Sequence, residues 1–377
     1  MVQQIPPTGL SNNRPFRNKI VNGDFNIFQR ATSATTAGHN TYTTADRWKT
    51  QLSTDGAFTT EQESLSLADQ VTTGSQKAWE IKCTSADTSI GAGQYALISQ
   101  DIEAQYLQDL FYGTSSAKDI TVSFWCKSNL TATFSLFLIK MDSTAYYIPV
   151  EFTTSSADTW EKKIITITPT QGSTSLITGS AAVINNDNGN GLQVGIALSG
   201  GSNLQGTNNT WSTSANYTTS NQANFLSSTS NNFYLTSFQL EVGSDATEFE
   251  VLPHDIQFQR CERYFQVIAR VADDTSSDLH YIATGAMYQA DQVIGVAHFQ
   301  TAMRAAPTIT ISTGSNYYAF SRNNAVDYFD NLIGYGRSPR NCLVYQDSAS
   351  NISGTAGHGG AMWCNNASAS ITASSEL

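Results

Sequence analysis

The sequence has few charged residues and no excess of basic ones. Asp, Glu, Lys and Arg make up 14% of its 377 residues, and the formal net charge is −11; typical soluble proteins carry about 25% charged residues. Nucleic acids and anionic membrane surfaces both attract clustered Lys and Arg, so we expect neither partner. No apolar run approaches the roughly 18 residues that a membrane-spanning helix needs, so we expect no membrane insertion.

Paired cysteines and catalytic motifs are also missing. The five cysteines form no CxxC pair, which leaves small buried side chains in strands as the expectation; they are Cys83, Cys126, Cys261, Cys342 and Cys364. The five histidines show no HExxH spacing, and neither a GxSxG elbow nor a Walker-type loop occurs. We therefore expect no catalytic residue, cofactor or metal. A hydrolase whose two carboxylates meet only in the fold stays open.

The first residues lack both a hydrophobic period and the features of a signal peptide. Residues 1–17 contain three prolines and one glycine, which predicts an extended arm, ordered only against a partner. The absence of a basic start followed by an apolar stretch suggests that the chain is made in the cytoplasm. It would then leave the cell by other means, such as lysis.

The chain instead shows the alternation of apolar and polar residues that is typical of β-strands. Ser, Thr, Asn, Gln and Gly dominate stretches such as "SGGSNLQGTNNTWSTSANYTTSNQ", and these residues favour turns over helices. In "DITVSFWCKS" (residues 119–128) apolar residues recur with period two, with Phe124 on one face and Trp125 on the other. Similar patterns run from 18 to about 252 and predict a β-sandwich domain. We expect Trp48, Trp79 and Trp125 to be mostly core residues.

Two segments break the strand pattern. "DIEAQYLQDLFYG" (residues 101–113) has Ile102, Tyr106, Leu110 and Phe111 at helical spacing, which predicts one short helix ending at Gly113. Residues 253–269 show a helix-like apolar stripe after a proline and predict a connector helix. Strand patterns resume at 270 and continue to 377, so we expect a second, smaller β-sandwich there. The predicted fold class is all-β.

Aromatic residues in polar loops are candidate sugar platforms, because pyranose rings stack on aromatic faces. Residues 315–337 offer the following set: Tyr317, Tyr318, Tyr328, Tyr335, Arg322 and Arg337. The same aromatic residues could instead pack against a neighbouring subunit, and both interpretations stay open. The loop around Trp211 and Tyr217 is the next candidate.

Several fragments together resemble a known family. "IVNGDFNIFQR", "YTTADRW", "SIGAGQYALISQDIEAQYLQDLFYGTSSAKDITVSFWCKSN", "DTWEKKIITI", "FYLTSFQLEVGSDATEFE" and "RCERYF" occur in this order. They resemble a domain common in bacteriophage tail-fibre and related virion proteins, a jelly roll similar to carbohydrate-binding modules. The resemblance covers roughly residues 18–265, with a weaker one beyond it. It implies that "VNGDFNIFQR" forms the first sandwich strand and that "ADRW" carries Trp48 into the core.

The resemblance also implies a function. A phage virion protein of this kind is usually a homotrimer, projects from the particle and attaches to host surface glycans, and the arm at residues 1–17 would bind other virion proteins. The chain would be made in the host cytoplasm. Two alternatives are a head-decoration protein and a glycan-depolymerising tailspike. Sugar-binding jelly rolls often hold a structural calcium where the first and last strands meet. Asp24 and Glu241 stand at those places, although calcium needs six or more oxygen ligands.

Overall fold

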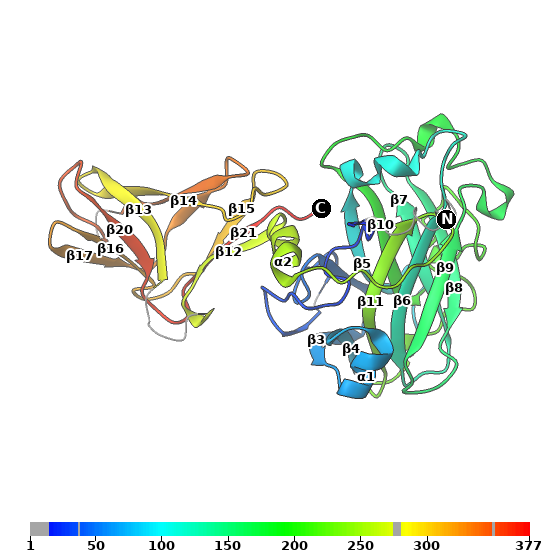
Figure 1. The fold of residues 1–377 in the computed structure, drawn as a ribbon. Coiled ribbons are helices and arrows are strands. Elements are labelled where there is room, and N and C mark those ends of the chain that lie inside the picture. Colours follow the sequence, from blue (N-terminus) through cyan, green and yellow to red (C-terminus); the bar gives the residue numbers. More distant parts are fainter. Residues whose placement is uncertain (1–14, 37, 274–279, 349–350) are drawn as a thin grey trace, which may run out of the picture. The chain divides into compact units, whose positions relative to one another are not determined.

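The computed structural model describes residues 15–36, 38–273, 280–348 and 351–377. The chain divides into two compact units, Met1–Gln257 with Leu377, and Phe258–Glu376 (Figure 1). Residues 1–14, which make up most of the arm expected at 1–17, lie outside the described residues. Within the described residues, no helix is both long and apolar enough to cross a membrane.

The first unit is a sandwich of two antiparallel sheets, and neighbouring strands in each sheet often come from distant parts of the sequence, as in a jelly roll. The six-stranded sheet runs in the order β1 (Ser33–Thr35), β3 (Ala57–Ser64), β4 (Lys77–Ser85), β11 (Asn232–Val242), β6 (Ile120–Ser128), β9 (Glu161–Ile167). The five-stranded sheet runs β2 (Trp48–Ser53), β5 (Tyr95–Glu103), β10 (Asn190–Gly200), β7 (Thr133–Lys140), β8 (Tyr146–Thr153). The expected all-β class is confirmed.

The second unit is also built from two antiparallel sheets. One has three strands, in the order β12 (Phe265–Arg270), β21 (Ser370–Ser374), β15 (Thr308–Ile311). The other has seven, in the order β17 (Ala325–Phe329), β16 (Tyr318–Arg322), β20 (Gly359–Cys364), β13 (His280–Gln289), β14 (Gln292–His298), β19 (Asn341–Gln346), β18 (Ile333–Tyr335). Its core includes Met287, Phe320 and Val344. The connector helix, α2 (His254–Glu262), contains the boundary between the two units and is shorter than the expected 253–269, because Phe265–Arg270 pairs with β21 as a strand.

Alternation places the core between the sheets of the first unit. In β6, Val122, Phe124 and Cys126 are wholly buried in the main hydrophobic cluster. Trp48 and Trp79 are 1% exposed and lie in the same cluster as Phe25. "ADRW" therefore does carry Trp48 into the core. Four of the cysteines are buried in strands and Cys261 is buried in α2.

Residues 18–30 do not form the expected first strand. Asn22 and Phe25 have positive φ angles of 58° and 55°, so the segment turns too sharply for a strand. Side chains hold it instead: Asn22 Oδ1 accepts from Ile27 N at 2.9 Å, and Trp48 Nε1 donates to Asn22 O at 3.1 Å. A Cβ at Gly23 would lie 2.1 Å from Phe238 O. The Asn22-Gly23 pair therefore allows the backbone to pack closely against Phe238 of β11.

The helix expected in residues 101–113 is a 3₁₀-helix, η2 (Ala104–Leu110). Ala104, Leu107 and Leu110 are its buried residues, at a spacing of three, which is the period of a 3₁₀-helix. Tyr106 and Phe111, expected on the buried face, are 45% and 49% exposed. The helix ends at Phe111 (φ 52°), two residues before Gly113. Four short 3₁₀ turns follow in the first unit and one in the second: η3 (Gln171–Ser173), η4 (Ser180–Ala182), η5 (Ser202–Leu204), η6 (Phe225–Ser227) and η7 (Val271–Asp273).

One α-helix in the first unit was not expected from the sequence. Helix α1 (Leu67–Thr73) begins after Ser66, whose side chain accepts from Asp69 N, and it ends at Gly74 with φ 75°. Both are standard helix-end signals. The missing signal is an apolar stripe, because Leu67 and Val71 are 76% and 81% exposed.

Candidate functional site

The tyrosines predicted to bind sugar between 315 and 337 do not form one platform. The segment is not a loop, because it contains the strands β16, β17 and β18. Tyr318 is wholly buried in the second unit's core, and its hydroxyl donates to Ser312 O at 2.8 Å. Its ring cannot contact a ligand, so the prediction for Tyr318 is wrong. Tyr317 packs against the same core, edge-on to Tyr318.

The exposed members of that set lie on opposite edges of the seven-stranded sheet. Tyr328, 49% exposed, is on β17, and Tyr335, 42% exposed, is on β18. Arg337 lies over the Tyr335 ring at 5.1 Å from its centroid. Arg322 is 7% exposed and pairs with Asp327 at 2.7 Å, so its charge is used within the chain. A sugar-binding role for Tyr317, Tyr328, Tyr335 and Arg337 stays a prediction, but five strands separate the two edges, so one sugar ring cannot contact both.

The second predicted region, around Trp211 and Tyr217, is a packing cluster. Trp211 is 2% exposed and its indole donates to Thr168 O at 2.9 Å. The Tyr217 ring meets Phe137 edge-on at 5.4 Å and Tyr147 edge-on at 5.8 Å. Burial raises the pKa of the Tyr217 hydroxyl to about 12. The contacts of Tyr217 hold the loop on the outer face of the five-stranded sheet, whereas Trp211 packs into the main hydrophobic cluster.

A groove lies on the outer face of the six-stranded sheet, along β6. Its volume is about 360 Å³, within the usual range for ligand pockets. The groove is lined by Val71, Thr72, Thr73, Gly74, Ser123, Trp125, Lys162, Ser237, Glu248, Phe249 and Val251. We call it the Trp125 groove.

Strand geometry puts Trp125 in this groove. Side chains alternate along β6, so Trp125 points away from the core that buries Phe124. In the two neighbouring strands Trp125 pairs with Thr236 of β11 and Lys162 of β9. The expectation that Trp125 is a core residue is therefore wrong. The period-two pattern already placed Trp125 on the face opposite Phe124. The prediction of a core position gave more weight to the general preference of tryptophan for protein cores.

The same face continues along β6 to Lys127. The Lys127 ammonium lies 4.4 Å from the centroid of the Tyr234 ring and 5.1 Å from that of Trp160. Burial and a hydrogen bond to Glu80 raise the pKa of Tyr234. This cation is held between two rings of its own chain, so Lys162 is the lysine that the Trp125 groove offers to a ligand.

Two segments outside the sheet form walls of the groove. The first is the end of α1, which supplies Val71 to Gly74; β11 is fixed beside it because Ser237 Oγ donates to Thr73 O at 2.7 Å. The second wall is the segment that follows β11, which carries Glu248, Phe249 and Val251.

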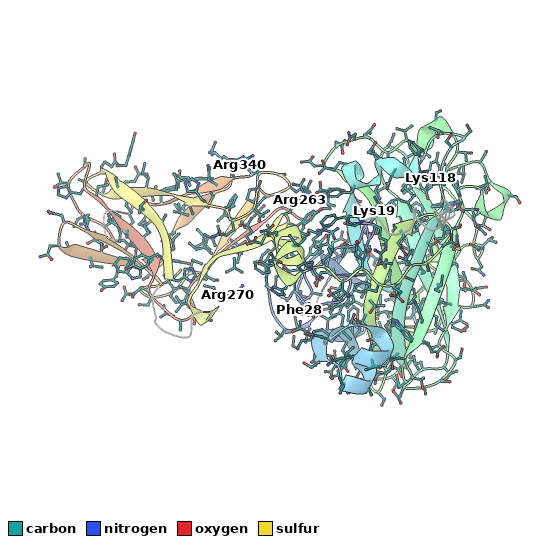
Figure 2. The ribbon with its side chains drawn as sticks, viewed as in Figure 1. Lys19, Phe28, Lys118, Arg263, Arg270 and Arg340 are labelled. Atoms are coloured by element: carbon teal, nitrogen blue, oxygen red, sulfur yellow. The ribbon has the colours of Figure 1, made fainter. Side chains whose placement is uncertain are left out.

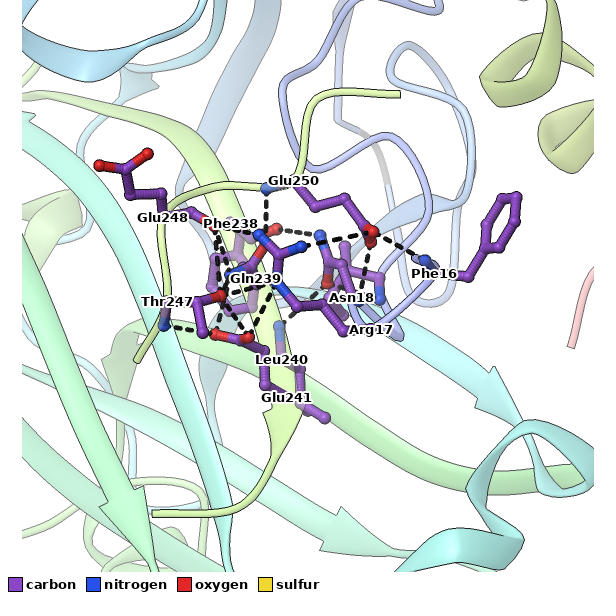
Figure 3. A network of polar contacts seen from close by, with 11 residues as sticks. Phe16, Arg17, Asn18, Phe238, Gln239, Leu240, Glu241, Thr247, Glu248 and Glu250 are labelled. Atoms are coloured by element: carbon purple, nitrogen blue, oxygen red, sulfur yellow. Dashed lines mark hydrogen bonds and ion pairs between the residues drawn. The ribbon is translucent and has the colours of Figure 1, made fainter. Parts of the chain in front are cut away.

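A polar network holds this second wall in place (Figure 3). Arg17 donates from Nη2 to the Glu248 carbonyl at 2.6 Å and lies 3.2 Å from the Glu241 carboxylate. Glu250 accepts from the backbone N–H groups of Phe16 and Asn18 at 2.7 and 3.0 Å. Residues 16–18, the end of the expected arm, therefore belong to this unit. The Glu248 side chain points away from the network in Figure 3.

A larger cavity of about 500 Å³ lies beside the network and is lined by charged residues, among them Arg17, Lys19, Asp109 and Lys118. Lys19 pairs with Asp109 at 2.8 Å, and the Lys118 ammonium lies 4.8 Å from the Phe111 ring centroid (both lysines are labelled in Figure 2). These charges already have partners within the chain.

Asp24 and Glu241 belong to two separate networks. Asp24 accepts hydrogen bonds from Gln257 and Asn26, whereas Glu241 accepts from Gln239 and Thr247. Burial raises the pKa of Asp24, and the bonds from Gln257 and Asn26 oppose that rise. Among the described residues no group of three His, Cys, Asp or Glu side chains is arranged to hold a metal ion.

The Trp125 groove combines an aromatic surface with a cation and an anion. Lys162 and Glu248 are exposed, and Trp125 is half-buried. Exposed charged groups can donate to and accept from a ligand's hydroxyls without losing all their hydration. An aromatic face bordered by donors and acceptors suits a polar ring with apolar C–H faces, which is the chemistry of a saccharide.

Comparisons with known proteins give only distant structural likenesses. No family model matches the sequence, and no curated protein matches it. A putative sugar binding protein from Bacteroides thetaiotaomicron is 13% identical, with 60% of this chain and 99% of that one covered and a TM-score of 0.33. TmCBM61, solved with β-1,4-galactotriose, is 11% identical, with 60% and 99% covered and a TM-score of 0.29. Tailspike protein 4 of bacteriophage CBA120 is 9% identical, with 61% and 22% covered and a TM-score of 0.28.

Proposed function

We propose that this chain is a non-enzymatic bacteriophage virion protein, a tail fibre or receptor-binding protein that attaches to host surface glycans. The observation that carries the glycan part is the Trp125 groove, where an aromatic ring shares one lining with Lys162 and Glu248. The virion part rests on the ordered fragments that resemble phage fibre domains. The groove replaces the C-terminal tyrosines as the proposed contact surface.

The low charge density supports this proposal. With 14% charged residues and many Ser, Thr and Asn side chains, the surface offers many uncharged donors and acceptors to sugar hydroxyls. A single aromatic contact contributes only about 1 kcal/mol, so one groove would bind weakly. A homotrimer would present three grooves, and linked sites gain avidity from their high effective concentration. Attachment to other virion proteins would fall to residues before Phe16.

Labelling of phage particles with an antibody to this chain separates the two virion roles. We expect label at the tail or its fibres, and purified protein should compete with phage for adsorption to the host. Label confined to the head, with no competition, would favour head decoration and overturn the attachment role.

A second assay tests the depolymerase alternative. The purified protein is incubated with host polysaccharide, and the chain length of the polysaccharide is then measured. We expect retention of the polysaccharide by the protein and no shortening. Shortened chains would show a tailspike-like enzyme and contradict the non-enzymatic assignment.

A further inference from the structure

The aliphatic side chains at the Trp125 groove are unusually exposed. Val71 and Val251, which both line the groove, are 81% and 68% exposed. Leu67 lies one turn before Val71 on the same side of α1 and is 76% exposed. Single exposed apolar residues are ordinary in folded proteins, whereas several of them beside one groove indicate a surface that a ligand or partner covers.

A fourth aliphatic residue lies on the neighbouring strand. Ile164 of β9 precedes the core residue Ile165, so its side chain faces outward, and it is 56% exposed. Its cross-strand partner in β6 is Ser123, which lines the groove. We call these four residues the aliphatic rim: Leu67, Val71, Ile164 and Val251.

A sugar that carries only hydroxyl groups would leave the aliphatic rim without a suitable contact. Hydroxyl groups need hydrogen-bond partners, and valine, leucine and isoleucine side chains offer none. The C–H face of such a sugar already has a matching surface in the indole of Trp125. The aliphatic rim therefore suits a substituent that is itself apolar.

The rest of the lining limits this substituent to a short and uncharged group. Four residues with hydroxyl groups share the lining with the two valines: Thr72, Thr73, Ser123 and Ser237. A long hydrocarbon chain would bury these polar groups at a cost, and the groove holds only about 360 Å³. Lys162 and Glu248 are one cation and one anion of the lining. Their charges balance, so the groove complements a neutral ligand better than a strongly acidic or basic one.

We propose that the Trp125 groove selects acetylated sugars, with the acetyl methyl group against the aliphatic rim. This inference rests on the proposed glycan binding and adds the class of sugar to it. An acetyl group is short and uncharged, and it joins a methyl group to a carbonyl oxygen that accepts hydrogen bonds. Lys162 and the hydroxyl groups of the lining are donors for that oxygen. Acetyl esters and acetamides share this chemistry.

Stepwise removal of acetyl groups from host surface polysaccharide tests the inference. Mild alkali cleaves acetyl esters and leaves acetamides. N-deacetylation followed by formylation of the freed amines then keeps each amide but removes its methyl group. Burial of one methyl group changes affinity by about fourfold. In titration calorimetry the dissociation constant of the wild type should rise about fourfold or more at one of the two steps, and that step identifies the ester or the acetamide.

Two threonine substitutions assign the effect to the aliphatic rim. Threonine has nearly the shape of valine but carries a hydroxyl in place of one methyl group, so Val71→Thr combined with Val251→Thr changes polarity and little else. The double variant should bind untreated polysaccharide as weakly as the wild type binds the methyl-free form. Both proteins should bind the methyl-free form equally. Val183→Thr is the matched control, since Val183 is 41% exposed and outside the groove lining.

Circular dichroism checks that each variant remains folded. Equal binding of all polysaccharide forms by the wild type would overturn this inference and leave the proposed glycan binding in place. A preference for the acetylated form that persists in the folded double variant would overturn it as well. A wild type that binds none of the forms would contradict the proposed function itself, and the sugar class with it.

Discussion

Phe124 and Trp125 are adjacent in β6 and serve opposite faces of the same sheet. Phe124 is wholly buried and stacks on Phe238, with ring centroids 5.3 Å apart and an interplanar angle of 11°. Trp125 lines the groove on the outer face, across from Lys162. Two adjacent positions of one strand therefore carry a ring that stabilises the core and a ring that is accessible to a ligand.

Alanine substitution should distinguish the two rings by their effect on stability. Phe124→Ala leaves a cavity in a packed core and should lower the free energy of unfolding by about 3–5 kcal/mol. Trp125→Ala should lower it by about 1 kcal/mol or less, because the ring lies outside the core and is partly exposed to solvent. Chemical denaturation of both variants measures the difference. Equal losses would contradict the assignment of the rings to opposite faces.

The sequence predicted the strand-rich fold and most of the core, because period-two alternation is a local signal. It did not predict that residues 18–30 avoid a strand, since the segment turns at Asn22 and Phe25, both with positive φ angles, and Gly23 between them accepts from the backbone N–H of Phe238, more than 200 positions away. The Trp125 groove was missed for a related reason. Its lining comes from α1, three strands and the 248–251 segment, which only the tertiary fold brings together.

Asn18 should be a strong determinant of stability, although it lies far from β11 in sequence. Its Oδ1 accepts from the backbone N–H groups of Ile20 and Leu240, both at 3.0 Å, and it is 5% exposed. Asn18→Ala leaves these buried donors without an acceptor and should cost about 2 kcal/mol. Phe16→Ala is the control, since Phe16 contributes its backbone N–H and its ring is exposed. Denaturation of Asn18→Ala within error of the wild type would refute the role.

Asp24 should make stability depend on pH. Burial raises its pKa in the folded state above the ordinary value of 3.8. The folded state then binds the proton more tightly than the unfolded state, so this contribution is present below pH 3.8 and is lost as pH rises through the folded pKa. The melting temperature of the wild type minus that of Asp24→Asn should fall as pH rises above 3.8. A difference that is constant with pH would contradict the assignment.

The five thiols should be unreactive in the native protein. All five are buried, and burial raises the pKa of Cys126 and Cys364 to about 12 and that of Cys342 to about 11. The thiolate is the reactive form, so a thiol reagent at pH 8 should label the native protein slowly. Denaturant should expose five equivalents. Fast labelling of the native protein would show that at least one cysteine is accessible.

The central claim is that the Trp125 groove binds host glycan, and titration calorimetry with host surface oligosaccharide tests it most directly. Trp125→Ala should raise the dissociation constant about tenfold or more, which corresponds to a loss of about 1.4 kcal/mol. Tyr95→Ala is the matched control, because Tyr95 is an aromatic residue on the outer face of the other sheet, stacked near Tyr217. The account predicts binding by the wild type and by Tyr95→Ala, and weak or no binding by folded Trp125→Ala. Binding by Trp125→Ala within about twofold of the wild type, well below the loss expected for a buried aromatic contact, would contradict it.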